Sequence, residues 1–193
     1  DRNLSRGLGD VYKRQLPVQG KNSEGINDMV IADEGIRFDA SLDKLSGLKT
    51  VIENGVITAG NASQITDGAA AVMVCNDAGL KKIQANPRAE IVSIAVVGDD
   101  PVFMLTGPIP ASKKALSAAN LSIDDIDLYE VNEAFAPVPL AWAKELKADR
   151  KKLNVNGGAM ALGHPLGATG AKLMTTLLPV SYTHLTLPTR DDV

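Results

Sequence analysis

The chain has few of the residues that cross-link a protein or hold it in a membrane. Cys75 is the single cysteine among 193 residues, so an internal disulfide is excluded and a reducing compartment is favoured. No apolar run approaches the roughly 20 residues that span a bilayer, and no signal peptide is visible. The formal net charge of −3 argues weakly against binding to nucleic acid. These absences predict a cytoplasmic protein without membrane or nucleic-acid partners.

The composition suits a globular protein. Hydrophobic residues make up 45% of the chain and charged residues 22%, which is the balance of a soluble folded protein. The length is sufficient for one compact core, or for a large part of a bigger one. Composition alone therefore leaves the number of cores open.

Both termini have a sequence that looks foreign to the rest of the chain. Read on opposite strands, one short DNA element encodes both Asp10–Gln15 and Val180–His184. It resembles a transposon end used to attach sequencing adaptors, so residues 1–15 and 180–193 are interpreted as translated adaptor and set aside. A genuine basic arm and a genuine threonine-rich tail are the alternative. The first interpretation leaves one native histidine, His164.

Hydrophobic patterning along the rest of the chain alternates between strands and helices. Residues 16–48 are polar and turn-rich and predict a long loop. A continuous apolar run at 69–74 predicts a strand buried on both faces, and the alternating pattern of 89–97 predicts another strand. Further along, the pattern predicts strands at 126–131 and 153–156 and helices at 110–119, 134–147 and 170–178. This order indicates a layered α/β domain.

Two loops carry the side chains that are suited to chemistry. Asn132 lies between a predicted strand and helix, and His164 lies in the analogous place after the next strand, within the glycine-rich stretch Asn156–Ala171. Ligands of layered α/β folds bind near the carboxyl ends of strands, so both side chains are expected to face one cavity. A histidine there can accept a proton from a nucleophile or donate to an oxyanion. An asparagine amide can hold a water or a carbonyl oxygen.

Each of these signals also has a structural explanation. A single histidine before a proline is more often structural than catalytic. An Asn-Glu pair at the start of a helix, here Asn132 and Glu133, is most often a cap. The glycine-rich stretch could suggest phosphate binding, but it lacks both the G-x-G-x-x-G spacing and a Walker lysine. Neither loop is specific when taken alone.

Taken together, the motifs resemble those of the thiolase family. The matching stretches follow the family's order and cover almost all of residues 20–178: Asp33–Arg37, Thr58–Ser63, Asp67–Ala70, Thr106–Ala111, Asn132–Phe135 and the loop of His164. The resemblance implies a layered α/β thiolase fold, a mixed sheet flanked by helices, of which an incomplete C-terminal half is present. Residues 16–50 would end the family's loop domain, and residues 51–179 would form a truncated C-terminal domain.

The resemblance implies that the full-length protein is an acyltransferase with coenzyme A thioesters as substrates. It would convert 3-ketoacyl-CoA and CoA to acyl-CoA and acetyl-CoA, or run the reverse condensation, as a homo-oligomer (a dimer or a tetramer). No permanently bound cofactor and no metal are implied. In this family a cysteine attacks the thioester, a histidine activates it and an asparagine orients a water in an oxyanion hole. By resemblance, His164 is the activating base and Asn132 the oxyanion-hole residue.

The resemblance also implies contacts with coenzyme A. Four residues match positions that hold its parts in the family: Ser63 at the pantetheine arm, Arg37 at the adenine-nucleotide end, and Ala134 and Phe135 along the tunnel of the arm. Two related families fit less well. The Asn132–Phe135 motif argues against the sterol-carrier thiolases, and ketoacyl synthases use two histidines where one is present here.

The chain departs from the family pattern in its cysteines. No cysteine precedes the Asp33–Gly35 loop, and the late Cys-x-Gly loop that should follow Leu178 is replaced by the foreign tail. Cys75 ends a predicted buried strand, so a place in the core is expected for it. The chain by itself is therefore predicted to be inactive, and a non-catalytic CoA-binding or scaffold protein is the alternative. The same incompleteness predicts exposed core edges and aggregation.

Overall fold

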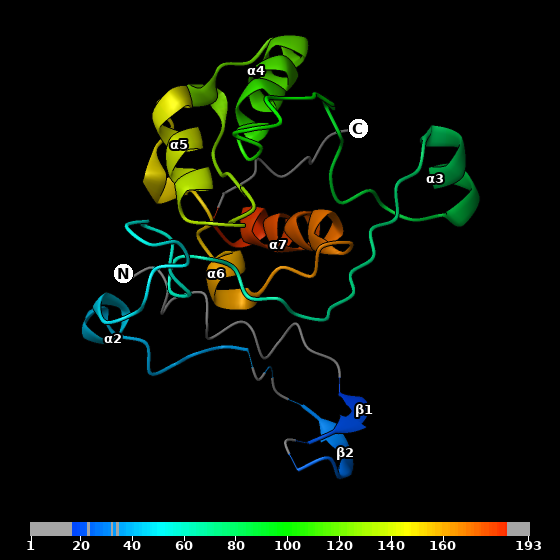
Figure 1. Cartoon of the computed structure of the whole chain (residues 1–193). Coiled ribbons are helices and arrows are strands. Elements are labelled where there is room, and N and C mark those ends of the chain that lie inside the picture. The colour runs from blue at the N-terminus through cyan, green and yellow to red at the C-terminus, as the bar shows by residue number, and fades with distance from the viewer. Residues whose placement is uncertain (1–16, 23, 32, 34, 185–193) are drawn as a thin grey trace.

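The structure, a computed structural model, describes residues 17–22, 24–31, 33 and 35–184 (Figure 1). Its strands and helices are β1 (Val18–Lys21), β2 (Asn27–Val30), α2 (Leu42–Ser46), α3 (Asp77–Ile83), α4 (Pro108–Ala119), α5 (Pro137–Leu146), α6 (Ala159–Leu162) and α7 (Thr169–His184). Short 3-10 turns occupy Ile123–Asp125 and Arg150–Lys152. The segments 1–15 and 185–193 of the termini interpreted as adaptor lie outside the described residues.

The helices α4 and α5 lie where the hydrophobic spacing predicts them. Each begins with a proline in its first turn, Pro108 in α4 and Pro137 in α5, where the missing N–H group would have no partner inside the helix. Each ends at a residue in the left-handed conformation, Asn120 with φ 61° and Lys147 with φ 57°. The local sequence therefore sets both ends of these helices.

The helices around the glycine-rich stretch differ from the prediction in extent. The short helix α6 is not predicted by the pattern, and α7 is longer than the predicted 170–178. α7 continues to His184 with Pro179 inside it. A proline removes one backbone donor from a helix, but it does not end a helix whose neighbours keep the helical conformation.

The first part of the predicted loop at 16–48 is instead a hairpin. β1 and β2 pair as antiparallel strands. Their turn is held by the Asn22 side chain, whose Oδ1 accepts hydrogen bonds of 3.0 Å from the backbone N–H groups of Glu24 and Ile26. Gly25 has φ 76° in the same turn. An asparagine followed by a left-handed glycine favours a tight turn, which forms strands here despite their polar sequence.

The predicted strands at 69–74 and 89–97 do not form. The hairpin is the one sheet within the described residues, and neither segment is paired in it. Their apolar side chains face solvent, with Met73 77% exposed, Ile94 75% and Val96 81%. Apolar patterning predicts which residues suit a sheet, but a strand also needs neighbours for its backbone hydrogen bonds. In the described part of the chain these two segments have no such neighbour.

The predicted strands at 126–131 and 153–156 meet in one parallel bridge, between Tyr129 and Leu153. Backbone hydrogen bonds of 2.9 Å on both sides of Tyr129 form this bridge. The pairing stops there because Asn154 has a left-handed φ of 46°, which turns the chain out of the ladder. The two segments therefore lie side by side, although they form a bridge rather than the two full strands predicted.

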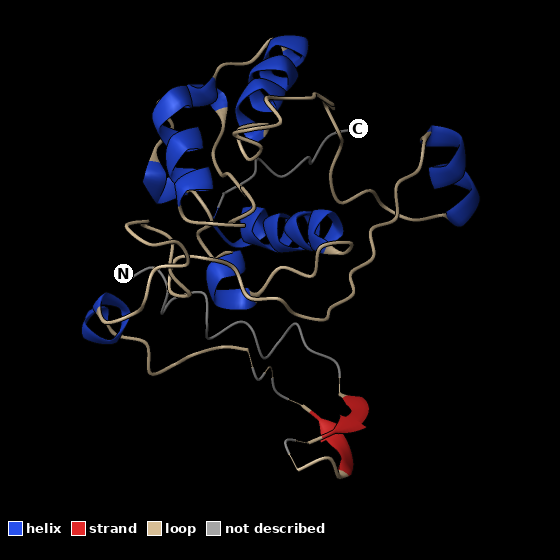
Figure 2. Ribbon diagram, in the orientation of Figure 1, coloured by secondary structure: helices blue, strands red, loops and turns tan. Residues whose placement is uncertain are grey.

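The core lies between α4, α5 and the segment that ends at Val131 (Figure 2). Trp142 of α5 is 4% exposed, and its ring meets that of Tyr129 edge to face, with 5.2 Å between centroids. Its Nε1 donates a hydrogen bond of 2.9 Å to Ser112 Oγ of α4. The buried cluster comprises Tyr129, Val131, Trp142, Ala143 and Leu146. This cluster fixes the segment that leads into Asn132.

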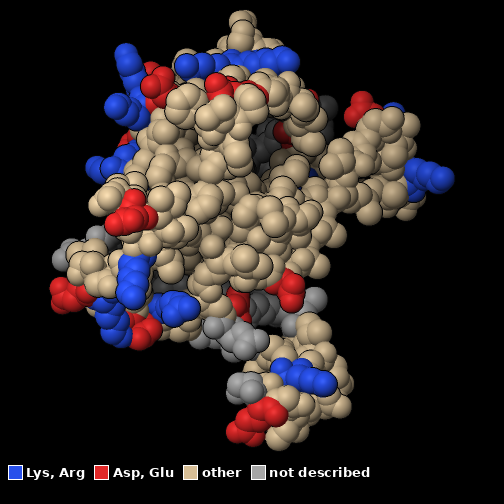
Figure 3. Space-filling model, viewed as in Figure 1, with Lys and Arg blue, Asp and Glu red and all other residues tan. Residues whose placement is uncertain are grey.

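Much of the remaining apolar surface is open to solvent. The face in Figure 3 carries its charged side chains mainly near the edges, around a broad uncharged area. The hairpin and α3 stand apart from the other helices in Figure 1. Among the described helices, none is both long enough and apolar enough to cross a membrane.

Candidate active site

Three segments converge at the predicted site. Asn132 lies in the loop before α5, here named the Asn132 loop, and His164 lies between α6 and α7, in the His164 turn. A third segment, residues 61–66, forms backbone hydrogen bonds of 3.0 Å with both, through Ser63 to the Asn132 loop and through Gln64 to the His164 turn. The 61–66 segment therefore holds the two loops against each other.

The structure brings the side chains of Asn132 and His164 together. Asn132 Nδ2 lies 3.3 Å from His164 Nε2, although 32 positions separate the residues in the sequence. Both residues are half-buried. At this distance the amide can donate to the ring if Nε2 is unprotonated, so the protonation of the other ring nitrogen decides the chemistry of the pair.

That other nitrogen, Nδ1 of His164, lies 2.6 Å from the hydroxyl oxygen of Thr169. The same hydroxyl donates its one hydrogen to the Pro165 carbonyl at 2.9 Å. With its hydrogen donated to Pro165, Thr169 Oγ1 accepts from the ring, which favours the neutral tautomer with the proton on Nδ1 and the lone pair on Nε2. A neutral histidine in this tautomer can take a proton at Nε2.

The amide of Asn132 has a second polar atom available. Its Oδ1 is buried and has no hydrogen-bond partner among the described residues. A buried carbonyl oxygen without a partner loses the free energy of hydration, so such an atom in a native site calls for a partner. The Asn132 side chain therefore has the capacity to hold a polar hydrogen beside Nε2 of His164.

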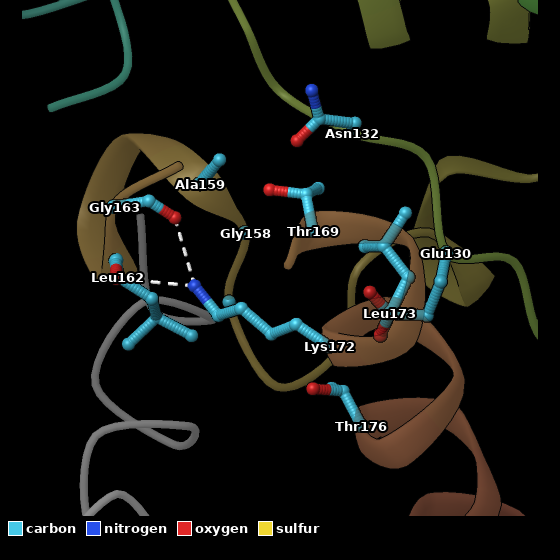
Figure 4. Close-up of a pocket in the computed structure, with 11 residues that line it drawn as sticks. Glu130, Asn132, Gly158, Ala159, Leu162, Gly163, Thr169, Lys172, Leu173 and Thr176 are labelled. Atoms are coloured by element: carbon cyan, nitrogen blue, oxygen red, sulfur yellow. Dashed lines mark hydrogen bonds between the residues drawn. The ribbon is translucent and has the colours of Figure 1, made fainter. Parts of the chain in front are cut away.

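A small pocket, lined in part by Asn132, Gly163 and Thr169, lies between α6, α7 and the Asn132 loop (Figure 4). Lys172 extends across it from the first turns of α7. Its Nζ donates to the carbonyl oxygens of Leu162, at 3.1 Å, and of Gly163, at 2.8 Å. These carbonyls lie at the end of α6, where backbone acceptors lack partners within the helix. The Lys172 ammonium group thus ties α7 to α6 and fixes the His164 turn.

Gly163, directly before His164, has two reasons to be glycine. Its φ of 81° is left-handed, a conformation that residues with a Cβ rarely adopt. A Cβ at this position would also overlap the side chain of Thr66 in the 61–66 segment. One glycine of the glycine-rich stretch is therefore explained by close approach between the His164 turn and the 61–66 segment.

The residues expected to contact coenzyme A lie in two places. Three of them meet where the 61–66 segment pairs with the residues before α5: Ser63, Ala134 and Phe135. Arg37 is exposed and lies on a separate segment. That segment is tied to the 61–66 segment by a hydrogen bond of 2.7 Å from Gln64 Nε2 to the Gly35 carbonyl. Within the described residues, no group of three or more His, Cys, Asp and Glu side chains could hold a metal ion.

Cys75 is exposed, so the prediction that it belongs to the core is wrong. The apolar run at 69–74 that precedes it has no covering layer in the described part of the chain, and the thiol is uncovered with it. Cys75 lies two residues before α3, which stands apart from α6 and α7 in Figure 1. The correction therefore removes a packing role without bringing the thiol to His164.

Several residues that hold the site together are missing from the sequence-based prediction. Thr169 carries a usable signal, because it directly precedes the helix predicted at 170–178 and lies five residues beyond His164. Lys172 and Asn154 carry no local signal. Glu133, which one interpretation made a cap, does accept from a helix start, but from Met160 N–H of α6 at 3.1 Å and not from α5.

Comparison with known proteins covers both parts of the chain. The family model described as thiolase, C-terminal domain, matches residues 85–183, and that described as thiolase, N-terminal domain, matches residues 9–78. The chain is 58% identical over 146 residues to the steroid 3-ketoacyl-CoA thiolase FadA6 of Mycobacterium tuberculosis, covering 76% of this chain and 36% of that protein.

Two solved structures share the fold. The human mitochondrial 3-ketoacyl-CoA thiolase aligns with a TM-score of 0.82 at 38% identity, and the Bacillus anthracis acetyl-CoA acetyltransferase with 0.85 at 37%. Each alignment covers 94% of this chain and 47% of the other, so the chain spans less than half the length of these relatives. The predicted layered thiolase fold is confirmed. The chain belongs to the thiolase family.

Proposed function

We propose that the full protein containing this chain transfers acyl groups between coenzyme A thioesters. The reaction would be cleavage of a 3-ketoacyl-CoA by CoA to acyl-CoA and acetyl-CoA, or the reverse condensation. The observation that carries the proposal is the hydrogen-bond chain from Asn132 through His164 to Thr169, which favours the tautomer with Nε2 of His164 unprotonated. The names of the relatives support it, since they are 3-ketoacyl-CoA thiolases and an acetyl-CoA acetyltransferase.

His164 would act as the activating base in this reaction. Nε2 takes the proton of a cysteine thiol, and the thiolate then attacks the 3-keto carbon of the substrate. The imidazolium that results can donate the same proton to the oxygen on which negative charge develops. The Thr169 hydroxyl accepts from Nδ1 before and after this transfer, so the ring stays in place while its charge changes. Asn132 would hold a water for the oxyanion with its amide. The bond between C2 and C3 breaks, the acyl group stays on the sulfur, and the leaving carbon takes a proton from a second cysteine to give acetyl-CoA; the acyl group then passes to the thiol of CoA.

Coenzyme A would bind along the 61–66 segment. Ser63 would contact the pantetheine arm, and Ala134 and Phe135 would line its tunnel. Their adjacency beside Asn132 supports this proposal, because the thioester at the end of the arm must reach the asparagine–histidine pair. Arg37 would contact the adenine-nucleotide end of CoA, in keeping with its exposed position on a separate segment.

We propose that the chain by itself does not turn over. Its single cysteine, Cys75, is exposed and lies two residues before α3, which stands apart from α6 and α7 in Figure 1, so we infer that the base has no thiol to activate. The alternative from another class is a CoA-binding or scaffold protein without catalysis. The acyltransferase and the non-catalytic protein differ in what the full open reading frame must encode, since the acyltransferase requires both reactive cysteines.

The test uses two proteins and one assay, thiolysis of acetoacetyl-CoA by CoA. The purified 193-residue chain should be inactive, and the product of the full open reading frame should be active. His164→Ala in the full protein should lower kcat by about 10²–10⁴, the range for loss of general base catalysis. Glu145→Gln on the exposed face of α5 is the control. Turnover by the chain refutes its inactivity, and an inactive full protein that still binds CoA supports the alternative.

Further proposals rest on the family resemblance. The full protein would be a cytoplasmic dimer or tetramer. Residues 16–50 would end its loop domain and residues 51–179 would belong to its C-terminal domain, with adaptor-derived sequence at both ends. Sequencing the genomic locus with a different library chemistry tests the last point, because recovery of the same ends would refute an adaptor origin.

A further inference from the structure

The carboxylate of Glu133 joins the two loops of the site. Its Oε1 accepts a hydrogen bond of 2.8 Å from Asn154 Nδ2, and its Oε2 accepts one of 3.1 Å from the backbone N–H of Met160. Glu133 follows Asn132 directly in the chain, and Met160 belongs to α6, which leads into the His164 turn. One charged group thus connects the segment that carries the amide with the segment that carries the ring.

Asn154 holds the other side of the Asn132 loop. It is 8% exposed, and its amide takes the place of a strand partner for Val131. Its Oδ1 accepts from Val131 N–H at 2.8 Å, and its Nδ2 donates to the Val131 carbonyl at 2.9 Å as well as to Glu133. The residues before and after Asn132 are therefore both bonded to one buried amide.

Space for the Glu133 carboxylate is provided by Gly158. A Cβ at this position would overlap the carboxyl group of Glu133. The φ of Gly158 is −126°, which any residue can adopt, so the backbone conformation does not demand a glycine. Gly158 is required by the close approach of Glu133 alone, and the chain is shaped to admit this side chain.

The direct contact within the pair is weak by comparison. The 3.3 Å between Asn132 Nδ2 and His164 Nε2 is at the long end for a hydrogen bond, so it cannot fix the loops by itself. The bonds of Glu133 and Asn154 are shorter, and those to the carboxylate are assisted by its charge. The spacing of the pair is therefore set by the groups beside it.

We infer that Glu133 and Asn154 are positioning residues that set the distance and angle between the Asn132 amide and His164 Nε2. The proposal does not require either residue to contact the substrate. An effect of these residues on acyl transfer rests on the proposed function, whereas their effect on the geometry of Asn132 and His164 does not. The experiment therefore measures the histidine ring directly.

The experiment measures the ¹⁵N resonances of His164 in the whole chain. The His184→Gln background leaves one histidine, so every imidazole signal belongs to His164. Magic-angle spinning of sedimented protein makes the measurement independent of self-association. Glu133→Gln keeps the size of the side chain, but its amide nitrogen cannot accept, so the donor that faces this nitrogen, Asn154 Nδ2 or Met160 N–H, loses its acceptor. We expect it to shift the Nε2 resonance, because the amide of Asn132 moves relative to the ring.

A double-variant comparison separates positioning from a general disturbance. In an Asn132→Ala background, Glu133→Gln should shift Nε2 little more than the exposed control Glu145→Gln does, because the effect passes through the Asn132 amide. Gly158→Ala displaces the carboxylate without substituting Glu133 or Asn154. It should shift the Nε2 resonance in the protein that retains Asn132, and it provides a second test should Glu133→Gln fail to fold. The inference is overturned if the Nε2 resonance does not shift in the protein that retains Asn132. It is also overturned if the shift is equally large in the Asn132→Ala background. Absence of thiolase activity alters neither outcome.

Discussion

At the scale of single residues, the hydroxyl of Thr169 has two partners with different demands. It donates to the Pro165 carbonyl and accepts from the His164 ring, and it can do both because a hydroxyl has one hydrogen and two lone pairs. A serine could make the same two bonds, whereas a valine of nearly the same shape could make neither. The identity of the base nitrogen in His164 is thus determined by a residue on the next helix.

Thr169→Val should remove the preference of the His164 ring for the tautomer protonated at Nδ1. In the His184→Gln background, the ¹⁵N spectrum of the parent chain should show Nδ1 protonated and Nε2 unprotonated. The valine variant should show a mixture, or the reverse tautomer, because Nδ1 loses its acceptor. The loss of two hydrogen bonds should also lower the free energy of unfolding by about 1–3 kcal/mol. Thr175→Val is the matched control, since this α7 hydroxyl bonds only to the Lys172 carbonyl among the described residues. A spectrum unchanged by Thr169→Val would contradict the assignment.

At the scale of elements, Tyr129 joins the bridge segment to the helical core. Its hydroxyl donates to the Ile123 carbonyl at 3.0 Å, and its ring packs against Trp142. Burial raises the pKa of Tyr129 above its usual value, and the negative charges of Asp124, Asp149 and Asp127 raise it further. The folded chain therefore disfavours the phenolate more than the unfolded chain does.

This raised pKa predicts a loss of stability at alkaline pH. Above about pH 10 the unfolded chain releases the tyrosine proton and the folded chain retains it, so the free energy of unfolding falls as the pH rises. Tyr129→Phe should cost about 1 kcal/mol at pH 8 through the lost hydrogen bond, and it should flatten the fall above pH 10. Urea unfolding at a series of pH values measures both effects. If the free energy of unfolding falls equally with pH in the parent and the variant, Tyr129 is not the cause of the loss of stability at alkaline pH.

Elements determined by nearby residues could be predicted from the sequence, and elements determined by distant partners could not. α4 and α5 follow from first-turn prolines and apolar spacing, which are properties of each segment alone. The segments 69–74 and 89–97 have strand composition, but their pairing depends on neighbours that no local pattern contains. The hairpin of β1 and β2 was not predicted, because its strands have a polar sequence and its turn depends on the Asn22 side chain.

The same distinction applies to the site. The proximity of Asn132 and His164 could be predicted because both follow strand segments that lie side by side, and the carboxyl ends of such segments meet. The contacts of Glu133 and Asn154 could not, since each joins residues more than twenty positions apart through side chains. The exposure of Cys75 could not be predicted either, because the apolar run beside it is typical of a covered strand.

At the scale of the whole molecule, the described chain exposes apolar segments that a closed core would cover. The segments at 69–74 and 89–97 combine exposed valine, isoleucine and methionine side chains with a backbone that pairs with no strand among the described residues. Such segments can pair with the same segments of another copy, as open sheet edges do. The surface therefore favours self-association of the chain over a stable monomer.

Sedimentation velocity should show association that increases with concentration. The double variant Ile94→Lys/Val96→Lys should reduce it, because both side chains are exposed and lysine opposes pairing of a strand edge. Val102→Lys is the matched control, since Val102 is 84% exposed but lies in a turn. A monomer at every concentration would contradict the prediction, as would an equal effect of the control.

The contacts of the 61–66 segment have a consequence for the order of folding. This segment, the Asn132 loop and the His164 turn are distant in the sequence, and each contributes backbone hydrogen bonds to another. Closing such long loops costs chain entropy before any contact offsets it, so these contacts form late. A partly folded chain can possess α4 and α5 without possessing the pair. We therefore expect Asn132 and His164 to come together only after the three segments have met, and local unfolding of any one segment to separate them.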